Sequence, residues 1–133
     1  MYMEQWIEVF KGIIPKEKYQ VSLKNGEESG LIIELKSKKR LVNITFGAVS
    51  AIRMLEEGII LNGLFDEIQI HKFKKDGFTN VIYRVEKGEF GKFIENIAGE
   101  LYEYLELKQF LVITTNYVIE VITEWNPQIH VYQ

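Results

Sequence analysis

The chain has 133 residues, of which 47% are apolar and 26% charged, and its formal net charge is −3. This composition is typical of a globular protein, and the length suits a single domain over residues 1–133. The absence of cysteine excludes disulfides, thiolate catalysis and cysteine-ligated metal sites, and the negative charge opposes binding to duplex DNA.

The N-terminal segment carries apolar residues at helical spacing. Five of them return to one side every three or four positions: Met3, Trp6, Ile7, Phe10 and Ile14. Gly12 and Pro15 would end a helix here. We therefore expect a short N-terminal helix whose apolar stripe packs against the rest of the domain.

The following segment alternates between apolar and polar side chains, which is typical of strands. Strands are expected at residues 19–23, 31–35 and 42–46. Asn25-Gly26 predicts a two-residue hairpin turn between the first two, and a turn near Ser37 leads to the third. The sequence therefore predicts an antiparallel meander.

The middle of the chain is less regular. Residues 48–55 fit either a strand or a short helix, and their alternation between Gly47 and Gly58 favours a strand. Residues 59–66 are expected to be a connection, and residues 68–70 to begin another strand.

The segment from 81 to 125 is the most organised part of the sequence. It predicts a strand at 81–86, then a long helix beginning at Lys87 or Gly88, then a hairpin at 108–125 that turns at Thr115-Asn116. Six apolar residues of the helix share one side and are expected to face the core: Phe90, Phe93, Ile94, Ile97, Leu101 and Leu105. Residues 128–133 follow Pro127 as an edge strand or tail.

Together these elements predict an α+β fold. We expect a single antiparallel, meander-like sheet with one long helix from the C-terminal half and a short N-terminal helix packed on it.

Motifs for catalysis or cofactor binding are absent from the sequence. The two histidines, His71 and His130, stand far apart, and no nucleotide-binding, zinc-protease or serine-hydrolase pattern occurs. The acidic pairs are neighbours in sequence, which rarely gives the separation across a cleft that a glycosidase needs. We therefore expect no catalytic residue, no metal site and no cofactor, and we keep an enzyme with scattered carboxylates as a third hypothesis.

Two basic runs, residues 36–40 and 72–75, fall on predicted turns. Hairpin tips that met at one end of the fold would form a positive patch able to hold phosphate. The interpretation that we favour is that lysine-rich tips discourage aggregation between sheet edges.

The outer face of the long helix is acidic. Four glutamates outnumber Lys92 on it, and two tyrosines lie nearby: Glu89, Glu95, Glu100 and Glu103, with Tyr102 and Tyr104. Tyrosine is favoured at interfaces, and an acidic surface suits a basic partner. A face that only improves solubility is the alternative.

Three phrases of the sequence resemble small uncharacterised proteins of Bacillus-type bacteria: Phe46 followed by AIRMLEEG (51–58), VIYRVEKGEF (81–90) and FLVITTNYVIEVI (110–122). The resemblance covers residues 41–125, although Gly88 stands where a serine cap would be usual. Some proteins of this kind are regarded as immunity proteins, made beside a secreted polymorphic toxin that they neutralise. The resemblance implies a non-enzymatic protein that blocks a toxin, and it transfers no active site.

The leading hypothesis is therefore a cytoplasmic protein-binding module with a cognate protein partner and with neither nucleic acid nor membrane as a partner. The expected partner-binding residues are Glu56, Glu57, Glu95, Glu100, Tyr102 and Glu103. The alternative is a small-ligand-binding domain with an aromatic pocket between sheet and helix, lined by Trp6, Tyr83, Phe93 and Trp125. The sequence leaves the oligomeric state open.

Overall fold

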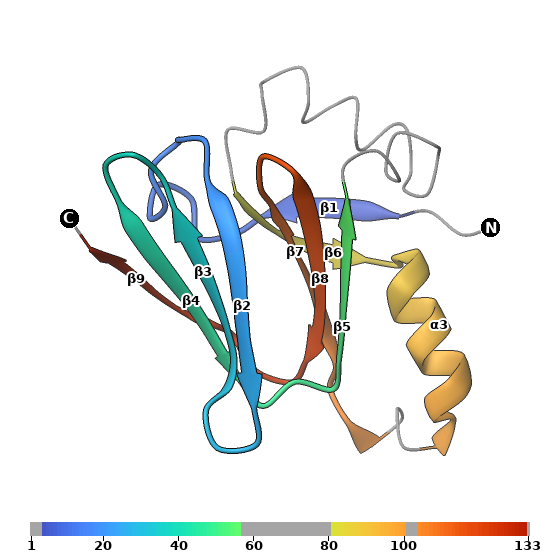
Figure 1. Cartoon of the computed structure of the whole chain (residues 1–133). Helices are drawn as coiled ribbons and strands as arrows, with labels where there is room; N and C mark the ends of the chain where they lie inside the picture. The colour runs from blue at the N-terminus through green and yellow to red at the C-terminus, as the bar shows by residue number, and fades with distance from the viewer. Residues whose placement is uncertain (1–3, 57–80, 101–103, 133) are drawn as a thin grey trace.

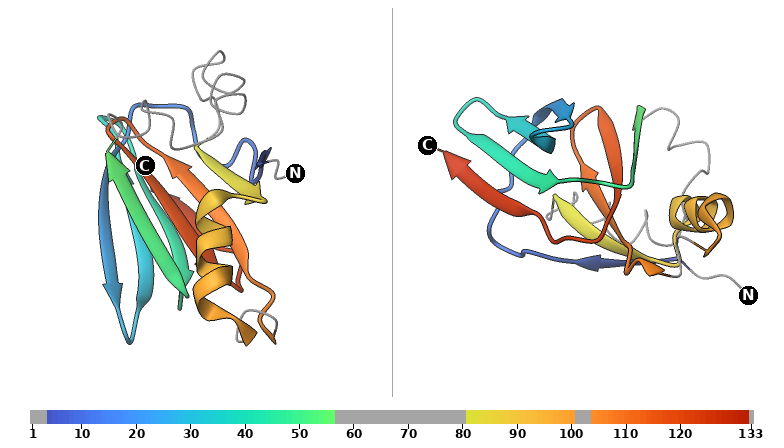
Figure 2. Two further views of the ribbon diagram at one scale, coloured as in Figure 1. Left: turned by 90° about the vertical axis from the view of Figure 1, so that its right-hand side faces the viewer. Right: turned by 90° about the horizontal axis from the view of Figure 1, so that it is seen from below.

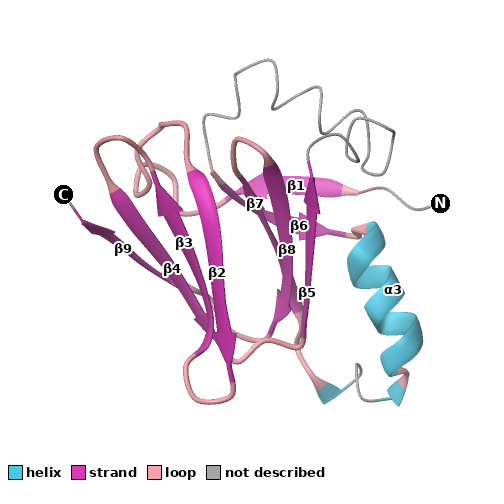
Figure 3. Ribbon diagram, viewed as in Figure 1, coloured by secondary structure: helices cyan, strands magenta, loops and turns pink. Residues whose placement is uncertain are grey.

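The computed structural model describes residues 4–56, 81–100 and 104–132, which form two antiparallel sheets and a helix (Figure 1, Figure 3). The five-stranded sheet has the order β1-β6-β7-β8-β5 and the four-stranded sheet the order β2-β3-β4-β9. The strands of the first are β1 (Gln5–Glu8), β6 (Ile82–Glu86), β7 (Lys108–Ile113), β8 (Tyr117–Thr123) and β5 (Ala51–Glu56). Those of the second are β2 (Gln20–Gly26), β3 (Gly30–Lys36), β4 (Leu41–Gly47) and β9 (Gln128–Tyr132). The helix is α3 (Glu89–Ala98).

The two sheets pack face to face, and the main core lies between them (Figure 2). The rings of Phe46 on β4 and Phe110 on β7 lie 5.6 Å apart between centroids, which joins the two sheets at this point. Residues of both sheets point into this core. They include Ile33, Leu35, Val42 and Ile44 from the four-stranded sheet and Ile82, Val112, Ile119 and Val121 from the five-stranded sheet.

The five-stranded sheet also has a buried outer face, opposite the four-stranded sheet. A second apolar cluster lies there, formed by Trp6, Tyr83, Val85, Leu111 and Val118. The N-terminal end of α3 covers part of this face, next to Gln109 and Glu120 (Figure 2). Consecutive residues of β6, β7 and β8 are buried, and these strands contain apolar runs such as FLVI in β7 instead of a strict alternation.

The predicted fold class is wrong, because the described chain is mainly β with two sheets rather than one. The predicted N-terminal helix is also wrong. Residues Gln5–Glu8 form β1, which pairs antiparallel with β6. Trp6 is 5% exposed and Ile7 42% exposed, so their side chains point to opposite faces as in a strand. The apolar stripe was too short to hold a helix without a partner, and β6 offered an edge for pairing instead.

The long C-terminal-half helix is also wrong in extent. Its start was predicted at Lys87 or Gly88; Gly88 is the N-cap, and α3 begins at Glu89 and ends at Ala98 after ten residues. Gly99 follows with φ 56° and donates its N–H to the carbonyl of Glu95. Positive φ suits glycine, so this residue ends the helix instead of being tolerated inside it.

Several predicted strands are confirmed. The meander is β2-β3-β4, residues 51–56 form a strand, β7 and β8 form a hairpin, and the segment after Pro127 is an edge strand, β9. The predicted Asn25-Gly26 turn is wrong, because both residues belong to β2 and the turn is made by residues 27–29. The expected strand at 68–70 lies outside the described residues.

Candidate functional site

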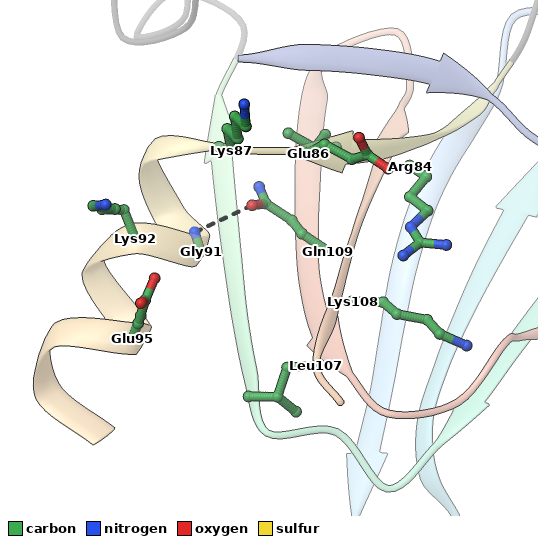
Figure 4. A pocket seen from close by; sticks show the side chains of 11 residues that line it. Arg84, Glu86, Lys87, Gly91, Lys92, Glu95, Leu107, Lys108 and Gln109 are labelled. Atoms are coloured by element: carbon green, nitrogen blue, oxygen red, sulfur yellow. Dashed lines mark hydrogen bonds between the residues drawn. The ribbon is translucent and has the colours of Figure 1, made fainter. Parts of the chain in front are cut away.

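The first turn of α3 is held on the sheet by a side chain from another element. Its N-cap residue, Gly88, has no side chain to cap the helix. Gln109 of β7 takes that place, since its Oε1 accepts a hydrogen bond from the Gly91 N–H at 3.1 Å (Figure 4). A Cβ atom at Gly88 would lie 2.5 Å from this oxygen and one at Gly91 2.9 Å from it. Glycine at both positions therefore lets Gln109 approach the helix.

Gln109 in turn contacts a fully buried carboxylate. Its Nε2 donates to Oε1 of Glu120 on β8 at 3.1 Å, and Nε of Arg53 on β5 donates to Oε2 of the same group. Burial raises the pKa of Glu120 to about 7, and the hydrogen bond and charge of Arg53 oppose that rise. The carboxylates of Glu89 and Glu4 raise the pKa further.

Arg53 completes the connection back to the helix. Its two terminal guanidinium nitrogens lie 3.4 and 3.3 Å from the carboxylate oxygens of Glu89 in the first turn of α3. Its guanidinium carbon lies 4.6 Å from the centre of the Phe90 ring, within the range of a cation–π contact. The group formed by Arg53, Glu89, Gln109 and Glu120, together with the Gly91 amide, is called the anchor cluster below. It fixes the start of α3 to two strands at once.

Beyond this first turn, the described residues cover the apolar side of α3 only in part. Phe90 is buried, Ile94 is partly buried, and Phe93 and Ile97 are 53% and 67% exposed. The prediction that Phe93 and Ile97 face the core is therefore wrong. Helical spacing showed correctly that these residues share a side, but only the anchored turn lies close enough to the sheet to be covered. Phe93 and Ile97 are called the exposed apolar pair below.

A cleft of about 740 Å³ lies between α3, the end of β6 and the start of β7, and Gly91 and Gln109 are among the residues that line it (Figure 4). Lys92 and Glu95 of the helix are among the residues that line it. Arg84 and Lys108 lie at the opposite end and point away from the helix in Figure 4. The cations of this cleft therefore do not converge on one point.

The predicted partner-binding residues do not form one patch. Glu95 lines the cleft, Glu100 is exposed just beyond the end of α3, and Glu56 is exposed at the end of edge strand β5. The other three predicted residues, Glu57, Tyr102 and Glu103, lie outside the described residues.

Only two residues of the expected aromatic pocket lie together. The rings of Trp6 and Tyr83 are 5.8 Å apart between centroids, and both side chains are buried. Phe93 and Trp125 are more than half exposed, and none of these four residues lines the cleft.

The anchor cluster was missed in the sequence, although a signal was present. Glu120 is the single charged residue in the apolar strand YVIEVIT, and Arg53 is the first in AIRMLE. The two are direct neighbours in the register of β5 and β8. A lone charge inside an apolar strand needs a buried partner, so these two residues were candidates for each other.

Among the described residues, no group of three His, Asp or Glu side chains is placed to hold a metal ion. Within the described part of the chain, no helix is long and apolar enough to cross a membrane. Comparison of the chain with models of protein families, with curated proteins and with solved structures finds no match.

Proposed function

We propose that this chain is a non-enzymatic, immunity-type protein that neutralises a cognate toxin by covering its functional surface. The observation that carries this proposal is the exposed apolar pair on a helix whose start is fixed by the anchor cluster. Large apolar side chains that a monomer leaves exposed are frequent centres of protein interfaces.

The anchoring of α3 supports this role energetically. A helix that is already fixed loses little conformational freedom when a partner binds, so more of the contact energy appears as affinity. The turn that precedes Phe93 is held by the hydrogen bond that Gln109 accepts from Gly91 and by the one that Arg53 donates to Glu89. Phe93 and Ile97 are not part of the buried core.

The charge beside the pair indicates the kind of partner. Glu89 precedes Phe93 by one helical turn and its side chain is 46% exposed, and Glu100 is exposed beyond Ile97. We propose a partner with an apolar pocket bordered by basic residues. A toxin that acts on nucleic acid has such a basic surface, and these carboxylates would speed its capture by electrostatic steering.

The test is co-expression with the protein encoded by the adjacent gene, read out by growth and by co-purification. We expect the wild-type chain to form a complex and to restore growth, and Phe93→Ala with Ile97→Ala to lose both. Asn96→Ala on the same helix and Glu106→Ala after it are the matched controls. Both variants should still form the complex and restore growth. Absence of a complex with the wild-type chain, or full activity of the double variant, would contradict the proposal.

A second candidate function is a small-ligand-binding domain, supported by the cleft between sheet and helix. Its volume of about 740 Å³ lies within the range of ligand pockets. Leu107→Trp should fill part of the cleft and abolish binding of any small molecule found by ligand-observed NMR screening. A screen in which the variant retains every ligand would contradict this function without affecting the first.

A further inference from the structure

A concentrated group of cations lies on the side of the molecule opposite α3. Lys16 and Lys18 come from the loop before β2, and Lys38, Lys39 and Arg40 come from the turn between β3 and β4. Together with Pro15, Glu17 and Ser37 they line a hollow of about 550 Å³, called the two-loop hollow below. Figure 1 shows this turn at the upper left and α3 at the right, and Figure 2 agrees that they are far apart.

The two loops are joined by a carboxylate. Oε1 of Glu17 accepts a hydrogen bond from the Ser37 hydroxyl at 2.6 Å, and Oε2 accepts one from Nε of Arg40 at 2.5 Å. The Ser37 hydroxyl oxygen also accepts the backbone N–H groups of Lys39 and Arg40, at 3.2 and 3.1 Å. The loops therefore hold each other in one arrangement, and the Arg40 side chain has a fixed direction.

Glu17 is the one carboxylate that lines the hollow, and it is occupied by this bracing. The hydrogen bond from Ser37, with further contributions from Arg40 and Lys39, lowers its pKa, so it stays ionised and keeps Arg40 in place. Four lysines of the hollow remain around the Glu17–Arg40 pair, in a chain whose net charge is −3. The positive charge is therefore a local feature of these loops.

We propose that the two-loop hollow binds a compound that carries two or more adjacent phosphate groups. Adjacent phosphates place several negative charges within a few ångströms, which matches lysines gathered from two loops around one oriented guanidinium. The hollow is large enough for such a group. Lysines that only oppose aggregation would not require the hydrogen bonds by which Glu17 joins the two loops. This proposal is independent of the proposed function, because it uses neither α3 nor its partner.

The test uses inorganic tripolyphosphate as the probe, titrated into the full chain by isothermal calorimetry at near-physiological salt. We expect saturable binding that weakens by about tenfold or more in Lys38→Glu with Lys39→Glu. Lys24→Glu with Lys108→Glu makes the same change in net charge on β2 and β7, at residues that do not line the hollow, and should weaken binding by less than about threefold. Equal losses in both variants, or no binding to the wild-type chain, would overturn the proposal.

Glu17→Gln separates a built site from general attraction. The substitution removes a negative charge, so charge alone predicts tighter binding of tripolyphosphate. A built site predicts weaker binding, by about fivefold or more, because Arg40 and the turn lose their brace. Tighter binding by this variant would overturn the proposal.

The phosphates could belong to a free compound or to a lipid headgroup. Sedimentation with phosphatidylcholine vesicles that contain a bisphosphorylated phosphatidylinositol distinguishes the two. Vesicle binding that tripolyphosphate displaces identifies a headgroup as a source, whereas calorimetric binding of tripolyphosphate without vesicle binding identifies a free compound. Both results support a phosphate site.

Discussion

Arg53 and Glu120 face each other directly across β5 and β8, and the arginine Nε donates to a carboxylate that has no exposed surface. Such a pair is costly to remove from water, and its neighbours determine whether the cost is offset. Here Gln109 donates to the second carboxylate oxygen, and Glu89 and the Phe90 ring contact the guanidinium. The pair thus connects the interior of the five-stranded sheet with the start of α3.

The stability of the protein should depend on pH through Glu120. Burial raises the pKa of this carboxyl from 4.5 to about 7 in the folded state. The folded chain therefore holds the proton more tightly than the unfolded chain. The contribution of Glu120 to the free energy of unfolding is fully present below pH 4.5 and is lost as the pH rises through 7. Urea unfolding at a series of pH values measures this slope.

Glu120→Gln is the control, because the amide does not titrate. The difference in slope between wild type and variant isolates this carboxyl from other groups, including Glu17, whose lowered pKa acts in the opposite direction. Identical slopes in the two proteins would show that Glu120 titrates as it does in the unfolded chain.

Gln109→Ala should destabilise the fold by about 1–3 kcal/mol. The substitution removes the acceptor of the Gly91 N–H and one of the two donors to the buried Glu120 carboxylate. A double-mutant cycle with Glu120→Gln measures the coupling, and we expect at least about 0.5 kcal/mol. Additive effects in the cycle would mean that the two side chains act separately.

Gly30→Ala should cost more than about 2 kcal/mol. Gly30 has φ +68°, and a Cβ atom there would lie 2.1 Å from the carbonyl carbon of Gly47 on the neighbouring strand. Gly26→Ala is the matched control at the other end of the same turn, where the nearest atom would be 3.8 Å away. Thermal or urea unfolding of both variants gives the comparison, and equal losses would speak against the close approach of β3 and β4 at this point.

Two apolar residues of one helix should respond differently to truncation. Phe90→Ala removes a ring that is 5% exposed and lies against Arg53, so we expect a loss of about 3 kcal/mol. Ile97→Ala removes a side chain that is 67% exposed, so the change should stay within about 0.5 kcal/mol. A large loss at Ile97 would show that this side chain is covered in solution.

Much of the strand content could be read from the sequence, because a two-residue period reports which face of a strand is buried. Val42, Ile44 and Phe46 point inward on β4 as their alternation predicts. The period does not report which sheet a strand joins. The chain moves from the four-stranded to the five-stranded sheet between β4 and β5, and nothing in the alternation marks that change.

The helix shows a different limit. The spacing of its apolar residues indicated which side of the helix faces the sheet. It did not indicate how much of the length of the helix the sheet would cover. Phe90 is buried and Ile97 is exposed because the contacts from β5 and β7 hold the first turn of the helix. Likewise, Lys16 and Lys18 could not be connected with residues 38–40, because that proximity depends on a carboxylate bridging two loops.

The order of strands has a consequence for how the polypeptide folds. β1 pairs with β6 from the second half of the chain, while β4 pairs with β9, whose Gln128 lies opposite Thr45. Each sheet thus combines early and late segments, and such distant pairings slow folding because a long loop must close first. During synthesis on the ribosome, one edge of β4 stays unpaired until β9, near residue 130, has been made. Chaperones that shield exposed strand edges should therefore engage the nascent chain during this interval.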